Sequence, residues 1–595
     1  IEKVVKMGVM ENAISLTSVK DQKAAGKTDG KKTVRIKGIA KLIDANLAGS
    51  KNHSKHCMLI LCEGDSAKAG IVSGLTREHR DYIGIFPLKG KIMNTFGMTQ
   101  TKINTNEEIK NIKQIMGINT KKTFKNAEAL RQSMRYGSVI FMTDQDLDGI
   151  HIKGLGINLF SSQWKNLFQL DRFVGYMNTP ILKAKKGKKE VSFYNESEYQ
   201  TWREQNNAGK GWSIKYYKGL GTSTAKEFRE YFAKMKIIYF KYDKENSDES
   251  VDKVFNKKRA DDRKLWLKDY DRSAISEVIT LKEKLTAEEV KINDIMMSKG
   301  GKGKGGKGKG GKAKASTAKN NKAITSVDRY YVSHRQFIDK ELIHFSKYDC
   351  ERSIANLVDG LKTSQRKILF SCFKRNLVKE IKVAQLAGYV SEHSGYHHGE
   401  MSLNKAIVGM AQEYPGSNNV ALLMPNGQFG SRLQGGKDSA SERYIFTKLN
   451  PITKYIYPEE DFPVLNYLDD DGTPVEPDFY VPIVPMVLVN GGKGIGTAFS
   501  FDIMSHSMSE IIDYLMYDLN HKIKKKETGT ETMIENNKKK IHPYYEGFKG
   551  EITLVEKNKY VIKGKYDVVG TDLVEITELP IGTWTDDYRQ YIETL

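Results

Sequence analysis

Two short apolar runs in the first quarter of the chain are each followed at once by acidic residues. Met58–Leu61 lies within MLILCEGDS, and Val139–Met142 lies within SVIFMTDQD. Short apolar runs bounded by polar residues are typical of buried strands. Because these runs alternate with stretches of helical periodicity, the pattern predicts an α/β domain built on a Rossmann-like parallel sheet.

Helical periodicity dominates the middle of the chain. The apolar residues of 354–361 recur at helical spacing, and Gly360 would end that helix. Thr363 or Ser364 would then cap a second helix, which carries two cations. Two helices joined by a tight turn, with cations on the second, indicate a DNA-binding helix-turn-helix or winged-helix domain.

From about residue 480 the pattern favours strands. YVPIVPMVLVN and GEITLVEKNKYVIKGKYDVV are rich in β-branched residues, with turn signals between them. They predict a β-rich third region. The chain is therefore expected to be multidomain, of α/β plus α+β class.

A Gly- and Lys-rich segment at 300–322, GGKGKGGKGKGGKAKASTAKNNK, separates the first region from the second. Glycine removes backbone preference and repeated lysines cannot be buried, so we expect a flexible basic tether. Loose attraction for phosphates is the alternative to a plain linker. Since the chain has 595 residues, and single cores stop growing at roughly 250 to 300 residues, we expect three or four domains.

The composition favours a polyanionic partner. There are 95 Lys and Arg against 73 Asp and Glu, which gives a net charge of +22. Nucleic acid fits better than a membrane, because no apolar run approaches the roughly 18 residues needed to span a bilayer. The four cysteines form no CxxC pair, so neither a zinc module nor a disulfide framework is indicated, and we expect a reducing intracellular compartment.

Acidic residues follow both predicted strands. Glu63 and Asp65 follow the first, and Asp144, Asp146 and Asp148 alternate after the second. Parallel strands present their carboxyl ends at one edge of a sheet, so Glu63 can meet Asp144 and Asp146 there. Crowded carboxylates need a cation to neutralise them, and hard oxygen ligands suit magnesium or calcium. The sequence therefore predicts a divalent-metal site.

Two other interpretations of these carboxylates stay open. The three aspartates and Gly149 match the first, third, fifth and sixth positions of a calcium-binding EF-hand loop. However, its twelfth position, which should be Glu, is Leu155, and a strand precedes it. Taken singly, Glu63 could also cap a helix or lie on the surface.

Several motifs, taken in order, carry a family resemblance. EGDSAKAG, PLKGKIMNT, MTDQDLDGIHIKG and YYKGLGTSTAKE resemble the TOPRIM metal-binding domain of type IIA DNA topoisomerases. DGLKTSQRKILF, KVAQLAGYV, YHHGEMSL, GQFGSRLQGGKDSASERYIF and NGGKGIGTAFS resemble the breakage-reunion region. With both regions in one chain, the sequence is similar to eukaryotic topoisomerase II, whereas bacterial gyrase divides them between two subunits. The resemblance implies reversible, magnesium-dependent double-strand DNA cleavage and religation.

The resemblance implies that Tyr444 is the nucleophile, which leaves a 5′-phosphotyrosyl link and a free 3′-hydroxyl. A neutral phenol is a weak nucleophile, so cations must favour the phenolate, and Arg443 is adjacent. Without the motif, Tyr444 would be taken for an ordinary aromatic, since the chain has 30 tyrosines. Glu442 stands where the human-type motif has Pro, which removes stiffness and adds negative charge.

By the same resemblance, Glu63, Asp144 and Asp146, with Asp148 near them, hold two magnesium ions. One ion would stabilise the leaving 3′-oxygen and the other would anchor a neighbouring phosphate. Besides Tyr444, the residues expected to act in catalysis are Arg443, Glu63, Lys91 and His398.

The resemblance also implies a set of DNA contacts. Ile495 corresponds to an apolar wedge that enters between base pairs and bends the duplex. Lys89 stands where the human-type sequence has Arg, and a lysine lacks the bidentate geometry of a guanidinium. Taken alone, Ile495 would be a core residue and the paired histidines ordinary surface residues. The expected contacts are Arg366, Lys367, His397, His398, Lys89, Lys91, Gln428, Lys437 and Ile495.

The resemblance predicts a domain order. We expect the end of a transducer and a linker at 1–54, a TOPRIM domain with its C-terminal extension at 55–240, a helical connector at 241–299, the tether at 300–323, a winged-helix domain with the catalytic tyrosine at 324–483, and a tower domain at 484–595. The chain opens on Ile1 and shows no glycine-rich ATPase segment. We therefore expect a fragment that lacks the ATPase domain, the coiled coil and the C-terminal gate, so that only the full protein would use ATP.

The implied partners are double-stranded DNA and a second copy of the chain, in a homodimer whose active sites combine the tyrosine of one protomer with the metal site of the other. The implied location is the nucleus, with no membrane association. Intercalating poisons would lodge near Glu63, Gly64, Asp65, Lys89 and Met401.

Three competing classes make different predictions. A metal-dependent nuclease of TOPRIM type needs only the carboxylates and water, so Tyr444→Phe would leave it active. A DNA-bending protein without catalysis would survive the loss of both the tyrosine and the carboxylates. A TOPRIM primase would give no reason for the tyrosine region.

Overall fold

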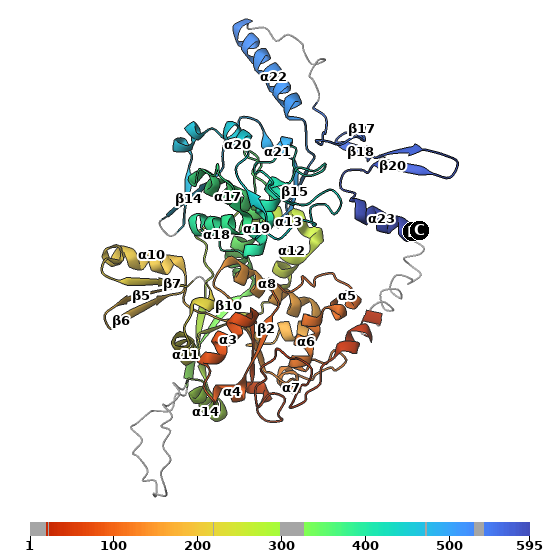
Figure 1. Cartoon of the computed structure of the whole chain (residues 1–595). Coiled ribbons are helices and arrows are strands. Elements are labelled where there is room, and N and C mark those ends of the chain that lie inside the picture. The colour runs from red at the N-terminus through yellow and green to blue at the C-terminus, as the bar shows by residue number, and fades with distance from the viewer. Residues whose placement is uncertain (1–19, 22, 218, 298–325, 471–472, 529–540) are drawn as a thin grey trace. The chain divides into compact units, whose positions relative to one another are not determined.

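The computed structural model describes residues 20–21, 23–217, 219–297, 326–470, 473–528 and 541–595. The expected transducer end at 1–54 is therefore described only in part, and the expected tether at 300–323 lies outside the described residues. The chain forms two compact units, Ile1–Lys347 and Tyr348–Leu595 (Figure 1).

A seven-stranded sheet is the framework of the first unit. Its order is β2 (Ile83–Leu88), β1 (Met58–Glu63), β3 (Ser138–Met142), β4 (Val174–Met177), β8 (Ile237–Lys241), β10 (Ser326–Ser333) and β9 (Ile279–Lys284). The first four strands run parallel, and β8 is antiparallel to β4. Both apolar runs are buried strands, as parallel strands covered on both faces require. The predicted parallel-sheet α/β domain is confirmed.

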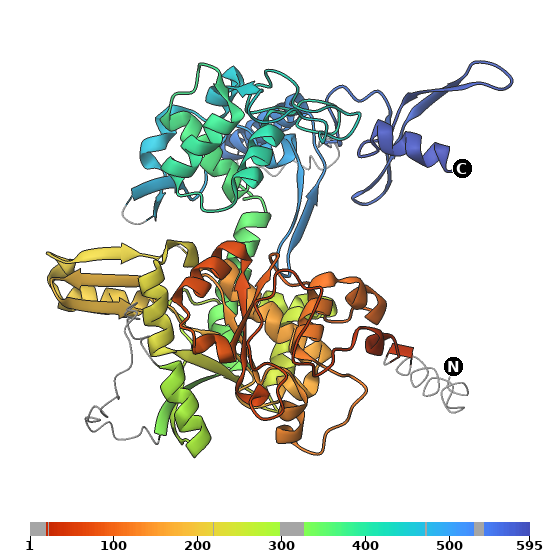
Figure 2. The same cartoon turned by 60° about the horizontal axis from the view of Figure 1, so that its bottom comes forward.

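Helices pack around this sheet (Figure 2). They are α3 (Gly64–Gly74), α4 (His79–Tyr82), α5 (Gln100–Thr105), α6 (Glu107–Met116), α7 (Ala127–Ser133), α8 (Leu147–Gln163), α9 (Lys165–Phe168), α11 (Ala225–Lys234), α12 (Ser247–Phe255), α13 (Ala260–Lys268), α14 (Ala287–Met296) and α15 (His334–Phe337). Within the described residues, no helix combines the length and apolar character needed to cross a membrane.

The strand after the Gly- and Lys-rich segment belongs to the first unit. β10 pairs with β8 in parallel and with β9 in antiparallel orientation. The division between the units falls at residue 347, inside α16 (Ile343–Ser353). The expected winged-helix segment, 324–483, thus begins in sequence before the second compact unit does.

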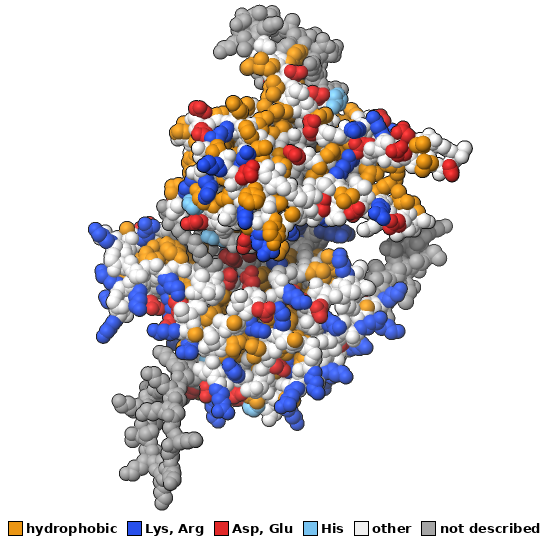
Figure 3. Space-filling view, viewed as in Figure 1, with side chains coloured by type: hydrophobic (Ala, Val, Ile, Leu, Met, Phe, Trp, Pro, Cys, Tyr) orange, Lys and Arg blue, Asp and Glu red, His pale blue; other side chains and the backbone are white. Residues whose placement is uncertain are grey.

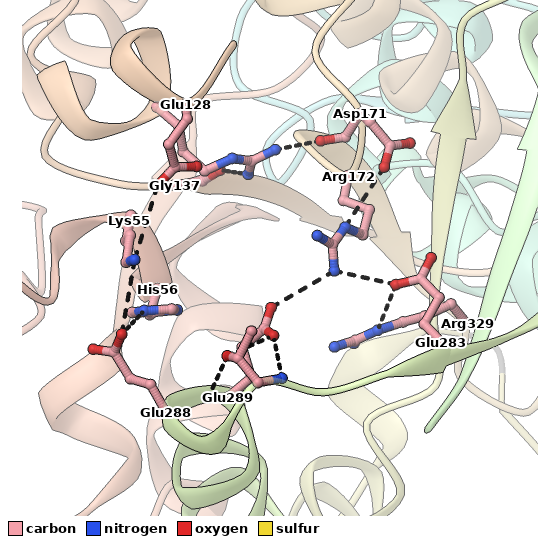
Figure 4. Close-up of polar contacts among 12 residues, drawn as sticks. Lys55, His56, Glu128, Gly137, Asp171, Arg172, Glu283, Glu288, Glu289 and Arg329 are labelled. Carbon is pink, nitrogen blue, oxygen red and sulfur yellow. Dashed lines mark hydrogen bonds and ion pairs between the residues drawn. The ribbon is translucent and has the colours of Figure 1, made fainter. Parts of the chain in front are cut away.

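Ion pairs at the amino ends of the parallel strands attach α14 to the sheet (Figure 4). Arg172 Nη1 lies 3.2 Å from a carboxylate oxygen of Glu283 in β9 and 4.0 Å from one of Glu289 in α14. Lys55 Nζ lies 3.7 Å from Glu288 of the same helix. This network occupies the end of the sheet opposite to the acidic residues.

A small module stands out from the large sheet (Figures 1 and 2). We call residues 182–216 the side arm. Its strands β5 (Leu182–Lys186), β6 (Lys189–Phe193) and β7 (Ser213–Tyr216) pair in the order β6-β5-β7, beside α10 (Glu196–Gln205). The arm has a core of its own, formed by Leu182, Ala184, Phe193 and Tyr199.

The second unit combines a helical core with several two-stranded sheets. The helices are α17 (Thr363–Lys374), α18 (Val383–Ser394), α19 (Glu400–Ala411), α20 (Pro451–Ile456), α21 (Met486–Val489), α22 (Met508–Thr528) and α23 (Thr585–Glu593). The paired strands are β11 (Ile381–Lys382) with β12 (Phe446–Thr447), β13 (Tyr467–Asp470) with β14 (Thr473–Pro477), β15 (Gly492–Ile495) with β16 (Ser500–Ile503), β17 (Glu551–Glu556) with β18 (Lys559–Lys563), and β19 (Lys565–Val568) with β20 (Val574–Glu578).

The β-rich prediction is confirmed for GEITLVEKNKYVIKGKYDVV, which forms β17, β18 and β19. It is wrong for YVPIVPMVLVN, where residues 480–485 form no strand and α21 follows. Pro482 and Pro485 lack the N–H groups that a strand ladder needs.

The helix predicted for 354–361 is also wrong, because α16 ends at Ser353 and a loop follows. Asn356 accepts a hydrogen bond from the Val358 N–H at 2.8 Å, and Asp359 accepts one from the Leu361 N–H at 2.9 Å. Such local side-chain bonds compete with helical ones. The second predicted helix is confirmed as α17, which begins at Thr363.

A buried ion pair fixes this loop to α17. The Asp359 side chain is 0% exposed and accepts hydrogen bonds from Arg366 Nε at 2.7 Å and Nη2 at 3.1 Å. It also accepts one from the Tyr480 N–H at 3.0 Å. One carboxylate therefore joins three segments of the second unit.

We predict that Asp359→Ala lowers the free energy of unfolding of the second unit by about 3–5 kcal/mol, because it leaves a buried guanidinium without its counter-charge. Denaturant unfolding measures the change. The matched control is Glu593→Ala, which breaks the exposed Arg589–Glu593 pair and should cost less than about 1 kcal/mol. Equal losses in the two variants would contradict the assigned role of Asp359.

Candidate active site

The carboxyl edge of the parallel sheet brings Glu63 and Asp144 together. β1 ends at Glu63, and the strand register pairs Cys62 with Met142, the last residue of β3. The acidic residues thus follow neighbouring strand ends, as the sequence predicts. Glu63 and Asp144 are each partly exposed at this edge.

The next two aspartates open α8. Asp146 is the N-cap, and its Oδ1 accepts a hydrogen bond from the Gly149 N–H at 2.7 Å. Asp148 lies in the first turn, 2.6 Å from Lys91 Nζ, which also lies 4.6 Å from the centre of the Phe345 ring. Each aspartate therefore already holds a positive or N–H partner, and the expected roles of Lys91 in catalysis and DNA contact remain predictions.

Glu63 is the carboxylate whose charge is least compensated. Burial, followed by the charges of Asp144, Asp146 and Asp148, raises the pKa of Glu63 to about 7. Its Oε2 is buried, and within the described residues no group forms a hydrogen bond with it. Burial likewise raises the pKa of Asp144, against a lowering by the Leu220 N–H. An unbonded carboxylate oxygen among like charges is a site that a cation would stabilise.

These oxygens do not yet converge on one point. Within the described ranges, no group of three or more His, Cys, Asp or Glu side chains is gathered closely enough to hold a metal ion. The carboxylates are nevertheless near enough to raise the pKa of Glu63. Each aspartate has another partner in this structure: the Leu220 N–H for Asp144, the Gly149 N–H for Asp146 and Lys91 for Asp148. The donor set fits a divalent cation, which would replace these partners as the counter-charge.

The turn at Gly219 and Leu220 supports the site, although its sequence alone indicates no role for it. The Leu220 N–H donates to Asp144 Oδ1 at 2.6 Å. Gly219 has φ +155°, and a Cβ there would lie 2.5 Å from Asp144 Oδ2. Only glycine allows this close approach. The motif YYKGLGTSTAKE was the available signal, but its contact with Asp144 depends on the fold.

Lys89 lies outside this cluster. Its side chain is exposed, with Nζ 3.3 Å from Glu107, and its backbone N–H donates to Glu108 at 2.6 Å. A carboxylate therefore compensates its charge in this structure, and its predicted DNA contact remains a prediction.

Tyr444 lies on a turn in the second unit. The turn closes through the hydrogen bond from the Tyr444 N–H to the Ser441 carbonyl at 2.9 Å, and the Ala384 N–H of α18 donates to the Glu442 carbonyl at 3.1 Å. The Tyr444 side chain is 71% exposed, and the Arg443 guanidinium lies 5.7 Å from its ring centre. The backbone is thus held while the hydroxyl faces solvent, as a nucleophile for a large substrate requires.

The predicted DNA contacts of the second unit fall into two groups. In the first group the side chains are accessible. Ile495 is 83% exposed at the end of the β15–β16 hairpin, and Gln428 and Lys437 are exposed. His397 Nε2 lies 3.5 Å from Asp470, and His398 Nε2 lies 2.6 Å from the Tyr348 hydroxyl.

In the second group the side chains are engaged inside the protein. Arg366 is 6% exposed, and its guanidinium is held by Asp359 and the Leu361 carbonyl. Lys367 Nζ lies 2.8 Å from a carboxylate oxygen of Glu476. Arg366 and Lys367 are therefore engaged inside the protein in this structure, and their contact with phosphate remains a prediction.

A parallel sheet that ends in a carboxylate cluster is the arrangement of a Toprim domain, and comparison with known families agrees. The family model described as "Toprim domain" matches residues 58–172, and "C-terminal associated domain of TOPRIM" matches 177–350. The model of the A-type chain of DNA gyrase/topoisomerase IV matches 352–595. The chain belongs to the type II DNA topoisomerases of the eukaryotic kind, as the resemblance indicated. A Toprim domain of this family implies dependence on a divalent metal ion.

Individual relatives support this assignment. DNA topoisomerase 2-alpha of Rattus norvegicus is 43% identical over 597 residues, and DNA topoisomerase 2 of Drosophila melanogaster is 43% identical over 594. Both alignments cover 100% of this chain but only 36% and 37% of those proteins. A crystal structure of the Plasmodium falciparum topoisomerase II DNA-binding, cleavage and re-ligation domain matches with a TM-score of 0.69 at 42% identity, over 94% of this chain and 68% of that one.

We predict that Glu63→Gln stabilises the metal-free protein at high pH only. A glutamate has a pKa near 4.3 in an unfolded chain, against about 7 here, so its contribution to stability is lost as the pH rises through 7. The variant should be about 1–3 kcal/mol more stable than the parent at pH 8 and nearly equal at pH 4. Thermal unfolding in a chelating buffer measures this, and a difference independent of pH would refute it.

The turn beside Asp144 yields a second prediction. Gly219→Ala places a Cβ against Asp144 Oδ2 and should weaken metal binding about 10- to 100-fold, as the loss of other supporting contacts does. Gly221→Ala is the control, because a Cβ there meets nothing within 4 Å. Titration with Mn²⁺, followed by its paramagnetic resonance signal, compares the two variants. Equal affinities would remove the turn from the site.

Proposed function

We propose that this chain performs the DNA cleavage and religation of a type II topoisomerase. The Tyr444 oxygen attacks a backbone phosphorus, an O–P bond forms, and the bond from phosphorus to the 3′-oxygen breaks. The phosphoester link keeps the energy of the broken bond, so the free 3′-hydroxyl can reverse the step without fuel. The observation that supports this most directly is the solvent-facing Tyr444 side chain on a hydrogen-bonded turn beside Arg443.

The neighbouring cations would prepare this step. Arg443 favours the phenolate and offers a planar fork to the non-bridging phosphate oxygens. The Tyr348 hydroxyl contacts the His398 ring and fixes its orientation, and His398 would act in catalysis at the phosphate. Lys91, now paired with Asp148, carries a charge that a phosphate could take over. Further backbone contacts come from Lys89, His397, Gln428, Lys437, Arg366 and Lys367.

Ile495 is well placed to insert between base pairs as an apolar wedge. A β-branched side chain that is 83% exposed at a hairpin end gains from insertion between base pairs, because the exposed apolar surface is then removed from water. Insertion would unstack the base pairs locally and bend the duplex.

The metal is proposed to be magnesium, with two ions for each active site. Glu63, Asp144, Asp146 and Asp148 would hold them, since hard carboxylate oxygens suit this cation. When bound, magnesium supplies Lewis-acid stabilisation of charge on phosphate oxygens. Glu63 contributes the oxygen that no group in the described chain satisfies.

The remaining partners are those of the family. We propose duplex DNA as substrate, a homodimer in which Tyr444 of one protomer serves the acidic edge of the other, and a nuclear location. ATP-driven strand passage would belong to a longer protein, since this chain spans only about a third of the length of its relatives. We propose that the domains follow one another as transducer end, TOPRIM domain with its extension, helical connector, tether, winged-helix domain and tower domain. Intercalating poisons would bind near Glu63, Gly64, Asp65, Lys89 and Met401.

We predict that Tyr444→Phe abolishes covalent capture of DNA. The parent chain, mixed with magnesium and a duplex and then denatured, should carry protein on the 5′ ends, while the variant should form at least about 1000-fold less adduct, because the attacking oxygen is missing. Electrophoresis of end-labelled DNA measures the adduct.

The control is Tyr455→Phe, which removes a hydroxyl from another tyrosine with a 75% exposed side chain in the same unit and should leave the adduct unchanged. If Tyr444→Phe still cleaved DNA with free 5′ ends, the chain would be a metal-dependent nuclease. If both variants bent DNA and neither the variants nor the parent cleaved it, the chain would be a bending protein.

A further inference from the structure

The end of the side arm concentrates lysines. β5 and β6 are joined by Gly187 and Lys188, and the strand register places Lys186 opposite Lys189. The loop before β7 meets the same end, since a Cβ on Gly211 would lie 3.6 Å from Lys186 Nζ. That loop adds another lysine. We call this set the tip lysines: Lys186, Lys188, Lys189 and Lys210.

The tip differs from the base of the same arm in its charge balance. At the base, Lys183 Nζ lies 3.1 Å from Glu190 and 2.9 Å from Glu230, and Lys215 Nζ lies 2.8 Å from Glu227. All four tip lysines are exposed, and in the described part of the chain no carboxylate lies within 4.0 Å of them. Unpaired positive charge therefore collects at one end of the arm.

This arrangement disfavours folding of the arm taken alone. Like charges directly opposite on antiparallel strands destabilise the pair, and Lys186 and Lys189 are such a pair. The arm's own apolar core holds the strands in this register, with Phe193 and Trp202 ring centres 5.1 Å apart. The packed base thus holds the tip lysines in place. Because β7 leads from the tip loop towards Gly219, which contacts Asp144, the tip is the end of the arm farther from the acidic edge.

We propose that the tip lysines bind the phosphate backbone of duplex DNA outside the cleavage site. This rests on the proposed function, since it concerns a duplex already engaged by the chain. Lys186 and Lys189 face each other across the two-residue turn, with Cα atoms about 4.5–5.5 Å apart. Together with Lys188 and Lys210 they offer several neighbouring cations to the closely spaced phosphates of a duplex. Figure 3 shows cationic side chains on the arm at the left of the view.

The chemistry of the tip favours DNA over an acidic protein segment. Stable protein interfaces depend on aromatic or aliphatic anchors in their buried centre. The tip sequence, KGKK at 186–189 with GKG of the neighbouring loop, contains only lysine and glycine. Lysine acts as a compact charge that attracts phosphates without reading bases. The contact is therefore independent of DNA sequence.

The test replaces all four tip lysines by glutamine and measures duplex binding by the whole chain over a series of salt concentrations. Each lost phosphate contact reduces the slope of log K against log salt by about 0.9, so the slope should fall by about 2–3. The control replaces Lys102, Lys121, Lys122 and Lys125, which are also exposed, and should leave the slope closer to that of the parent.

Covalent capture of saturating DNA should stay unchanged in the tip variant, because no tip lysine belongs to the cleavage residues. A slope equal to that of the parent, or an equal fall in the control, would overturn the proposal. So would weakened binding of polyglutamate with an unchanged DNA slope, which would identify an acidic protein segment as the partner. If the parent bound DNA but formed no Tyr444 adduct, the proposed function would fail while the tip contact could still be scored from the slopes.

Discussion

Mutual repulsion among carboxylates at one edge of a parallel sheet is the constraint on which the proposed chemistry depends. β1 and β3 deliver Glu63 and Asp144 to neighbouring positions because parallel strands end at the same edge. The protein offsets this crowding only in part, with the Leu220 N–H for Asp144 and Lys91 for Asp148. Glu63 keeps a buried oxygen without a hydrogen bond, and its pKa is raised to about 7, first by burial and then by the neighbouring carboxylates. A carboxylate in this setting is one that a divalent cation would stabilise, and the proposed metal site rests on it.

The second unit differs from the acidic edge in how it places its charged and reactive side chains. It buries its structural charges in pairs, as at Asp359 and Arg366, and leaves its proposed reactive side chains in solvent. Tyr444 and Ile495 are large side chains exposed on hydrogen-bonded turns, where a hydrophobic core would normally take them. The exposure of these two side chains has a physical reason if a bound DNA duplex covers them. In the proposed function, the reaction is thus divided between a cation-binding edge on one unit and a nucleophile on the other.

The part of this arrangement that depends on local pattern could be predicted from the sequence. The buried strands, their parallel pairing and the acidic residues after them follow from short apolar runs and from the geometry of α/β sheets. Tyr444 could be found only through the family resemblance, since nothing local distinguishes it from other tyrosines. The contact of Gly219 and Leu220 with Asp144 joins residues 75 and 76 positions apart in sequence, and no periodicity reveals it. The burial of Arg366 could not be predicted, because its partner Asp359 lies in a loop whose apolar residues have helical spacing. In YVPIVPMVLVN the two prolines prevent a strand, although the β-branched residues favour one.

The central claim is that the acidic edge and Tyr444 of different protomers act as one site. Mixing two inactive variants tests it most directly. Chains with Glu63→Gln and chains with Tyr444→Phe should each form almost no adduct alone, but a heterodimer of the two keeps one intact site if the site is shared between protomers. The account predicts that mixing restores covalent capture on one DNA strand only, seen as nicked rather than linear plasmid after denaturation. If the mixture formed no adduct although both variants bound DNA and formed heterodimers, the shared site would be contradicted.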